Sequence, residues 1–236
     1  MPPVAVALQV VAICGGARMK EGNTSKLLTH FLGGMQEGGA SVELFYSRQL
    51  DSQPCLGEFA CWTTNPGVCH INDKMQLLYP RLRDADVLVL ATPVYIPLPG
   101  EMQNLLNRLL PLIDPRIRWL KGRTRPVGFR AGVKIRKIVL VSTSGWWERA
   151  NFGTVMRIVR EFARGAGVDF AGGLLRPNFN VMVEDRKKAQ EIYNAAKQAG
   201  YQLAIDGKMS KHTLATVSQP LIPSKEWRRR IAQEDF

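Results

Sequence analysis

The sequence predicts a doubly wound α/β fold, in which a five-stranded parallel sheet of order 2-1-3-4-5 carries helices on both faces. Five apolar runs with strand character alternate with five helical patterns along the 236 residues. Two of these runs, Val87–Ala91 and Ile138–Val141, are apolar without interruption, as expected of central parallel strands buried on both faces. In a sheet of this class the ligand lies at the carboxyl ends of the strands. The loops that follow the strands are therefore the first place to look for a binding site.

The order of the elements follows the apolar pattern. Strands are expected at Val4–Cys14, Val42–Tyr46, Val87–Thr92, Ile138–Thr143 and Phe170–Leu175. Helices are expected between and after them, at Thr24–Gln36, Asp73–Leu82, Gly100–Leu112, Phe152–Ala166 and Glu184–Ile205. Residues 1–207 are thus expected to form one domain. Residues 208–236 are expected to be an irregular C-terminal extension that wraps a neighbouring surface and takes part in oligomer contacts.

Two further segments, 48–71 and 114–134, are long for simple connections, so we expect them to carry function or oligomer contacts. The exposed-looking tryptophans Trp62, Trp119, Trp146 and Trp147 support the same interpretation, because interfaces are enriched in aromatic residues. The expected assembly is a homodimer or a homotetramer.

The composition describes a packed globular chain, with 45% hydrophobic and 22% charged residues. No segment approaches the roughly 20 apolar residues that span a bilayer. The apolar N-terminal run reads as a buried strand and not as a signal peptide, so no membrane association and a cytoplasmic location are expected.

The net charge of +12 is high, but it does not by itself identify the kind of partner. No DNA- or RNA-binding motif accompanies the basic residues, so no nucleic-acid partner is expected. The Lys and Arg residues are dispersed, apart from Arg228–Arg230 and a cluster from Arg116 to Lys137. Binding of anionic ligands and a merely basic, solvated surface both remain open.

The segment after the first strand has the features of a phosphate loop. Gly15 and Gly16 allow a tight turn, and a helix is expected to begin near Asn23, where its unpaired N–H groups attract an anion. The spacing matches neither Gly-x-Gly-x-x-Gly nor Gly-x-x-x-x-Gly-Lys-Ser/Thr. It suits a single phosphomonoester, such as that of FMN, although an ordinary capped turn has the same appearance. The candidate phosphate-binding residues are Gly16, Ala17, Arg18, Asn23, Thr24 and Ser25.

Two more loops are expected at the same edge. The loop after the third strand is stiffened by prolines, and its Tyr95 and backbone groups are suited to a flat ring. The loop after the fourth strand has Gly145 for close backbone approach and Trp146 as an aromatic wall. A plain turn and interface packing are the alternatives. The candidate ring-binding residues are Pro93, Val94, Tyr95, Ile96, Ser142, Ser144, Gly145 and Trp146.

Taken together, these motifs resemble the flavodoxin-like NAD(P)H-dependent FMN reductase superfamily, near its iron–sulfur flavoprotein branch. The resemblance covers roughly residues 8–205. It rests on Gly15-Gly-Ala-Arg18 with Gly22-Asn-Thr-Ser25, on Pro54-Cys55, Cys61-Trp62 and Gly67-x-Cys69 with Asp73-x-Met75, on Ala85-Asp86 and Ala91-Thr-Pro-Val-Tyr95, and on Asn104-x-x-Asn-Arg108. It implies FMN with its phosphate in the first loop and its isoalloxazine between the second and third.

The chain departs from this superfamily at two places. Relatives usually have Ser-Pro where this chain has Gly16-Ala17, which removes one hydroxyl contact to the phosphate. The branch that carries a cluster has four closely spaced cysteines, whereas here Glu58 stands in place of the second ligand between Cys55 and Cys61. Four thiolates are the rule for such clusters, so no metal is expected on Cys55, Cys61 and Cys69, although zinc beside His70 is not excluded.

The expected function is that of an FMN-dependent NAD(P)H oxidoreductase. A hydride passes from NADH or NADPH through FMN to a quinone, a flavin, a nitro or azo compound or a similar small acceptor. No catalytic side chain is expected, because the cofactor carries the chemistry. The alternative is a non-enzymatic electron carrier of the flavodoxin or iron–sulfur flavoprotein type, against which the net charge of +12 argues because such carriers are typically acidic.

Overall fold

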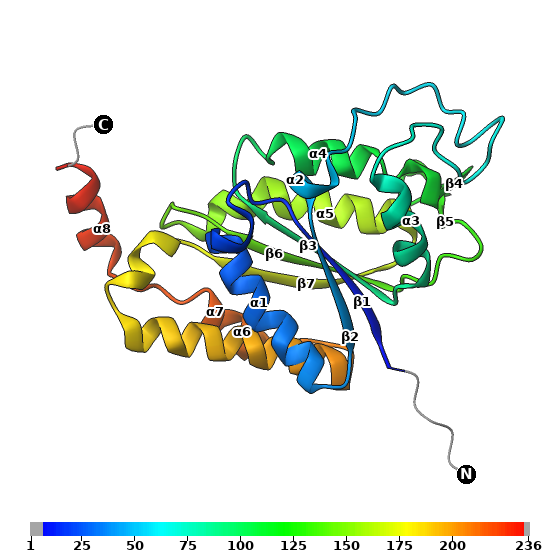
Figure 1. The fold of residues 1–236 in the computed structure, drawn as a ribbon. Coiled ribbons are helices and arrows are strands. Elements are labelled where there is room, and N and C mark those ends of the chain that lie inside the picture. The colour runs from blue at the N-terminus through cyan, green and yellow to red at the C-terminus, as the bar shows by residue number, and fades with distance from the viewer. Residues whose placement is uncertain (1–6, 234–236) are drawn as a thin grey trace, which may run out of the picture.

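The structure is a computed structural model of the chain, and it describes residues 7–233. Its centre is a parallel sheet of five strands in the order β2-β1-β3-β6-β7, which are labelled in Figure 1. Counting only these strands, the order is 2-1-3-4-5, which confirms the prediction. The strands are β1 (Gln9–Cys14), β2 (Ser41–Tyr46), β3 (Val87–Pro93), β6 (Lys137–Thr143) and β7 (Asp169–Arg176).

Helices cover both faces of the sheet, and each layer has its own apolar core. One layer contains α1 (Asn23–Glu37), α6 (Arg186–Asp206) and α7 (Lys211–Val217); the other contains α3 (Met75–Asp84), α4 (Gly100–Asn107) and α5 (Gly153–Ala166). Alternate residues of β1 and β3 point into opposite cores, so that Val89 packs with the first layer and Leu88 with the second. Two short helices add to these layers: Leu50 of α2 (Ser47–Leu50) belongs to the second core, and Trp227 of α8 (Ser224–Ile231) packs against the first. Among residues 7–233, no helix has both the length and the apolar character that a membrane crossing requires.

Several boundaries differ from the sequence-based expectation. The first strand begins at Gln9, and the part of it expected from Val4 to Val6 lies outside the described residues. The helix expected to reach Leu112 ends at Asn107 and is followed by a 3-10 turn over Leu110–Leu112. Pro111 favours this end, because it has no N–H to donate to the carbonyl of Asn107 one α-helical turn earlier.

The expectation of an irregular tail after residue 207 was wrong. The segment contains α7 and α8, and the side chain of Ser210 caps α7 by accepting a hydrogen bond from the backbone N–H of Thr213. The tail between these helices lies against the end of β7, where the buried guanidinium of Arg176 donates to the carbonyls of Val217 and Gln219 at 2.9 and 2.8 Å. The tail is therefore ordered by its own cap and by this buried arginine.

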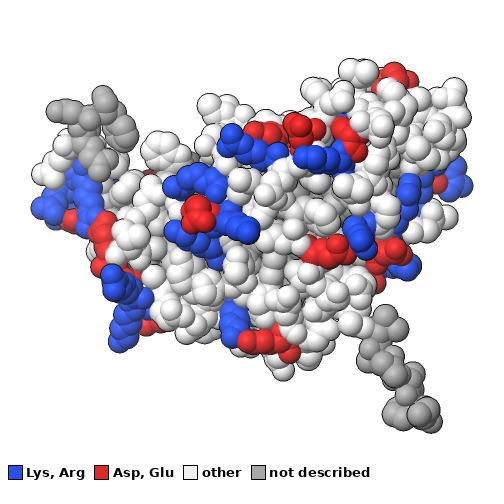
Figure 2. Space-filling model, viewed as in Figure 1, with Lys and Arg blue, Asp and Glu red and all other residues white. Residues whose placement is uncertain are grey.

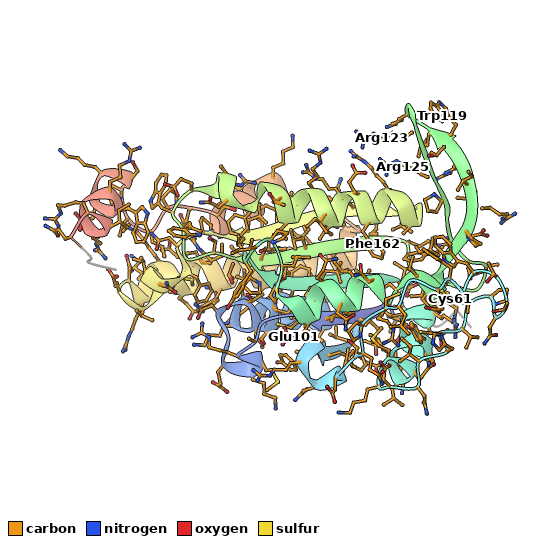
Figure 3. All side chains as sticks on the ribbon, turned by 90° about the horizontal axis from the view of Figure 1, so that it is seen from above. Cys61, Glu101, Trp119, Arg123, Arg125 and Phe162 are labelled. Atoms are coloured by element: carbon orange, nitrogen blue, oxygen red, sulfur yellow. The ribbon has the colours of Figure 1, made fainter. Side chains whose placement is uncertain are left out.

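The long segment 114–134 forms mainly an antiparallel hairpin that sequence reasoning did not foresee. Its strands are β4 (Ile113–Leu120) and β5 (Arg123–Phe129), and a bulge between Asp114 and Ile117 shifts their register. The hairpin stands on the α5 side of the sheet, as Figure 3 shows. Proline at positions 115 and 126 and the many arginines obscure the alternation that would mark these strands in the sequence.

Candidate active site

A pocket of about 330 Å³ lies at the carboxyl edge of the parallel sheet. Four loops build it, which follow β1, β3, β6 and β7. Its lining residues are Gly16, Ala17, Arg18, Gly22, Asn23, Thr24, Pro93, Val94, Tyr95, Thr143, Ser144, Gly145, Phe179 and Asn180. This is the edge where doubly wound sheets bind their ligands, because the strand order reverses there and leaves a crevice.

The loop after β1 offers an anion-binding end of a helix. It is held to the sheet by the N–H of Gly15, which donates to the carbonyl of Ala91 at 2.7 Å. From outside, the guanidinium of Arg48 donates to the carbonyl of Ala17 at 3.1 Å. Helix α1 then begins at Asn23 without a side chain that caps it. Its first N–H groups lack intrahelical acceptors, so the partial positive charge of this helix end faces the pocket.

Two buried hydroxyl contacts set the position of α1 relative to the sheet. The hydroxyls of Thr24 and Thr143 lie 2.6 Å apart, which joins the first turn of α1 to the end of β6. The hydroxyl of Ser25 lies 3.1 Å from that of Tyr46, at the end of β2. The Ser25 hydroxyl is thus used inside the fold and does not line the pocket, contrary to its expected place among the phosphate contacts.

The loop after β3 contributes side chains to the pocket, but two of its backbone N–H groups are already hydrogen-bonded within the protein. The N–H of Val94 donates to the carbonyl of Thr143 at 2.9 Å, and the N–H of Tyr95 donates to that of Pro97 at 3.0 Å. Pro93, Val94 and Tyr95 line the pocket, and the Tyr95 side chain is 62% exposed and available for stacking. Ile96 is almost fully exposed and lies outside the pocket lining.

The loop after β6 contributes Ser144 and Gly145 to the pocket. The Ser144 hydroxyl accepts a hydrogen bond from the N–H of Trp146 at 3.0 Å and so shapes the turn. Ser142 is fully buried and donates to the carbonyl of Thr92 at 2.7 Å, which makes it a link between β6 and β3. Ser142 and Trp146, both expected at the ring, are therefore outside the pocket lining.

Sequence reasoning missed a fourth loop, which follows β7. Phe179 is buried against the pocket, and its N–H donates to the carbonyl of Ser144 at 2.9 Å. Asn180 faces the amino end of α1, where its side-chain oxygen accepts from the Asn23 amide at 3.3 Å. A signal was present, because the fifth parallel strand must end at the same edge as the other four.

The electrostatics of the pocket favour an anion. Arg18 is its cationic side chain, and none of the described lining residues is acidic. Beneath the loop, burial raises the pKa of the Cys14 thiol above its usual value, so this thiol stays protonated and neutral near pH 7. The pocket thus combines an uncapped helix end, one guanidinium and an uncharged floor.

The three cysteines of the segment 48–71 gather at a different place, beside the end of α4. Cys55, Cys61 and Cys69 line a space of only about 10 Å³. Glu58, which takes the place of a fourth thiolate in the sequence, is paired with His70, with 3.0 Å between Oε1 and Nδ1. The described residues contain no group of three or more His, Cys, Asp or Glu side chains arranged to hold a metal ion. Glu58 lines the same space as the three thiols, but only three thiolates are present and the space holds scarcely one water molecule, which does not fit a four-iron cluster.

Comparison with known proteins defines the family. Residues 8–146 match the model of a family described as NADPH-dependent FMN reductase. Because this match covers more than half of the chain, the protein belongs to the NADPH-dependent FMN reductase family. The description of this family names NADPH and FMN, the donor and the cofactor that the resemblance in the sequence implied.

Two curated relatives are iron–sulfur flavoproteins. One, from Methanocaldococcus jannaschii, is 29% identical over 139 residues, which are 58% of this chain and 63% of the relative. Another, from Archaeoglobus fulgidus, is 30% identical over 105 residues, which are 44% of this chain and 46% of the relative. The chain therefore matches about half to three fifths of the length of these relatives.

Solved structures share the fold at low sequence identity. An NAD(P)H:quinone oxidoreductase from Methanothermobacter marburgensis has a TM-score of 0.60 and 18% identity, over 84% of this chain and 98% of the other. An azoreductase from Bacillus anthracis has a TM-score of 0.58 and 16% identity, over 84% and 99% of the two chains. These likenesses confirm the flavodoxin-like α/β fold.

Proposed function

We propose that this protein is an FMN-dependent NAD(P)H oxidoreductase that reduces a small acceptor of the quinone or azo type. The observation that carries the proposal is the pocket at the carboxyl edge, which combines the uncapped amino end of α1 with a loop bearing an exposed tyrosine. Family membership supports the cofactor and the donor. The structural relatives named as a quinone oxidoreductase and an azoreductase support the class of acceptor.

The pocket residues divide into two groups by their chemistry. Gly16, Ala17, Arg18, Asn23 and Thr24 surround the helix end and would hold the FMN phosphate through N–H groups and one guanidinium. Pro93, Val94, Tyr95, Ser144 and Gly145 form the other part of the pocket and would position the isoalloxazine. We add Thr143, Phe179 and Asn180 to these site residues, because they line the same space.

The cofactor supplies hydride transfer when bound, so the protein needs no acid–base pair. The chain's own part is to bind and orient. The Thr24–Thr143 contact would keep the phosphate end at a set distance from the ring end, since it joins the first turn of α1 to the end of β6, next to Ser144. Tyr95 at the mouth of the pocket offers an aromatic face to a flat acceptor or to the nicotinamide.

The deciding experiment is a visible spectrum of the purified protein before and after NADH or NADPH is added without air. We expect oxidised flavin bands at about one FMN per chain, which either nucleotide bleaches and a quinone or azo dye restores. Bound flavin that neither nucleotide bleaches would overturn the enzyme proposal in favour of an electron carrier. Absence of flavin binding would overturn both.

We further propose that the protein assembles as a homodimer or homotetramer. Trp119 and Ile117 on the hairpin are more than 70% exposed, and Leu56 on the cysteine segment is 72% exposed. Large exposed apolar side chains in such numbers are typical of a surface that another subunit covers. Light scattering at micromolar concentration tests this, and a monomeric mass would refute it.

A further inference from the structure

A second cleft, of about 510 Å³, separates the hairpin from helix α5. It shares no lining residue with the pocket at the sheet edge. Of the residues that the structure describes, six cationic side chains and a single acidic one line it: Lys121, Arg123, Arg125, Arg157, Arg160 and Arg164, with Glu161. Three of its cations, Lys121, Arg123 and Arg125, belong to the basic cluster between Arg116 and Lys137, to which the proposed function assigns no role.

The cations are brought together by two regular elements that face each other. Arg123 and Arg125 are two apart on β5 and therefore share one face of that strand. Arg157, Arg160 and Arg164 recur at three- and four-residue steps on α5 and share one side of the helix. Figure 3 shows Arg123 and Arg125 between the hairpin and α5, with Trp119 at the far end of the hairpin.

Only some of these charges are neutralised by the protein. Glu161 accepts from Arg125 and from Arg164, each at 2.6 Å, so one carboxylate holds two guanidinium groups in place. These arginines keep the pKa of Glu161 below its usual value, with Arg125 as the larger cause, and the carboxylate stays ionised. Arg160 packs over the ring of Phe170, with 5.4 Å between guanidinium carbon and ring centroid.

The remaining cations lack an acidic partner. Within residues 7–233, the side chains of Lys121, Arg123, Arg157 and Arg160 form no ion pair. Like charges gathered around a cleft repel one another and raise the local concentration of anions. Guanidinium groups bind phosphate oxygens through two parallel hydrogen bonds, and the cleft has the volume of a site for a small ligand.

We propose that this cleft binds the pyrophosphate group of a nucleotide. Cations in two opposed rows, on β5 and α5, offer more positive charge than one phosphate carries, so a group with two adjacent phosphates complements the cleft better. Such a group can belong to the nicotinamide dinucleotide that serves as electron donor or to a free nucleoside diphosphate. If the pyrophosphate belongs to the electron donor, the inference rests on the proposed function. If it belongs to a free nucleotide, the inference does not.

Calorimetric titration of the FMN-loaded protein with inorganic pyrophosphate tests the proposal. The cleft variant carries Arg123→Ala and Arg157→Ala, two exposed arginines without an ion-pair partner among the described residues. The matched control carries Lys225→Ala and Arg228→Ala on α8, which removes the same net charge from exposed positions elsewhere. We expect pyrophosphate to bind the cleft variant at least tenfold more weakly, and the control within twofold of the unaltered protein.

Two further measurements identify the source. An NADPH KM that rises tenfold in the cleft variant, with the control unchanged, assigns the pyrophosphate to the donor. An unchanged KM with loss of ADP binding assigns it to a free nucleotide. Flavin content and melting temperature report whether the variants fold.

The proposal fails if pyrophosphate binds the cleft variant and the control equally well. It also fails if a DNA oligonucleotide binds the protein, loses affinity in the cleft variant and is not displaced by pyrophosphate, because the cleft would then serve a nucleic acid. Either result leaves bleaching of the flavin by NAD(P)H intact, so a failure here is distinguishable from a failure of the proposed function.

Discussion

Asp73 and Arg108 form a buried ion pair with two contacts, 2.6 and 3.1 Å long, between the carboxylate and the guanidinium. The exposed fractions of the two side chains are 6% and 0%. The same groups hold Gln53, whose N–H donates to Asp73 at 2.9 Å and whose carbonyl accepts from Arg108 at 2.7 Å. The pair therefore fastens the cysteine segment to the end of α4.

Replacing Asp73→Asn should destabilise the protein strongly, because it leaves the Arg108 charge buried without a counter-charge. Breaking a buried pair in this way costs about 3–5 kcal/mol. Urea unfolding at pH 7 measures the change in the free energy of unfolding. The control is Asp84→Asn, which removes an exposed pair with Lys134 and should change the free energy of unfolding far less, because water screens that pair. Equal effects of the two substitutions would contradict the assignment.

The same pair predicts a direction for the pH dependence. Burial raises the pKa of Asp73, but hydrogen bonds from Arg108 and from the backbone outweigh it and hold the pKa below the unfolded value of 3.8. A lowered carboxyl pKa contributes stability above the unfolded pKa, and this contribution is lost as the pH falls through the folded pKa. The difference in unfolding free energy between the native protein and Asp73→Asn should thus be constant from pH 7 to about pH 5 and shrink below about pH 4. A difference in unfolding free energy that grows as the pH falls would refute this account.

Among residues 7–233, Arg18 is the one cationic side chain that lines the pocket, so it should carry the charge-assisted contact to the FMN phosphate. Arg18→Ala removes about 1.5–3 kcal/mol of binding free energy, which corresponds to a roughly tenfold or larger loss of affinity. Quenching of FMN fluorescence during titration measures this. Lys20→Ala is the matched control, since Lys20 is exposed on the same loop but does not line the pocket. An unaltered affinity in Arg18→Ala would place the phosphate elsewhere.

Gly15 lets the phosphate loop pack closely on α4. A Cβ atom at this position would lie 2.7 Å from the Cβ of Met102, too close for either backbone to stay in place. Gly15→Ala should destabilise the fold by about 1–3 kcal/mol and weaken FMN binding, because the loop must move. At Gly33 in α1 an added Cβ meets nothing within 4 Å, so Gly33→Ala should stabilise the protein by up to about 1 kcal/mol. Urea unfolding measures the free energy of unfolding of both variants, which should fall in Gly15→Ala and rise in Gly33→Ala. A change of the same sign in both would contradict the assignment.

The cysteine segment leads to a prediction about iron. Protein prepared without air should show flavin absorption alone, without stoichiometric iron, because Glu58 is paired with His70 and the thiols enclose so little space. Iron analysis and the visible spectrum measure this together. About four irons per chain, the content of one cubane cluster, would overturn the prediction and favour electron transfer.

Much of the fold could be predicted because it depends on local pattern. Continuous apolar runs such as Val87–Ala91 indicate strands buried on both faces, and alternation with helices leaves few topologies. The phosphate loop was predictable for the same reason, since two glycines before a polar helix start are neighbours in the chain. Ten of the candidate site residues line the pocket at the sheet edge: Gly16, Ala17, Arg18, Asn23, Thr24, Pro93, Val94, Tyr95, Ser144 and Gly145.

The sequence by itself determined the strand order and the loops that form the pocket, because hydrophobic periodicity and turn chemistry act over a few neighbouring residues. Only the tertiary structure decided which polar groups face the pocket: Ser25 turns to Tyr46, whereas Asn180 arrives from 157 residues away to meet Asn23. It alone placed the hairpin cations opposite those of α5. On the face seen in Figure 2, by contrast, basic and acidic side chains lie intermingled. Partners distant in the chain meet only when packing of the whole core brings their elements together, and no local pattern records that meeting.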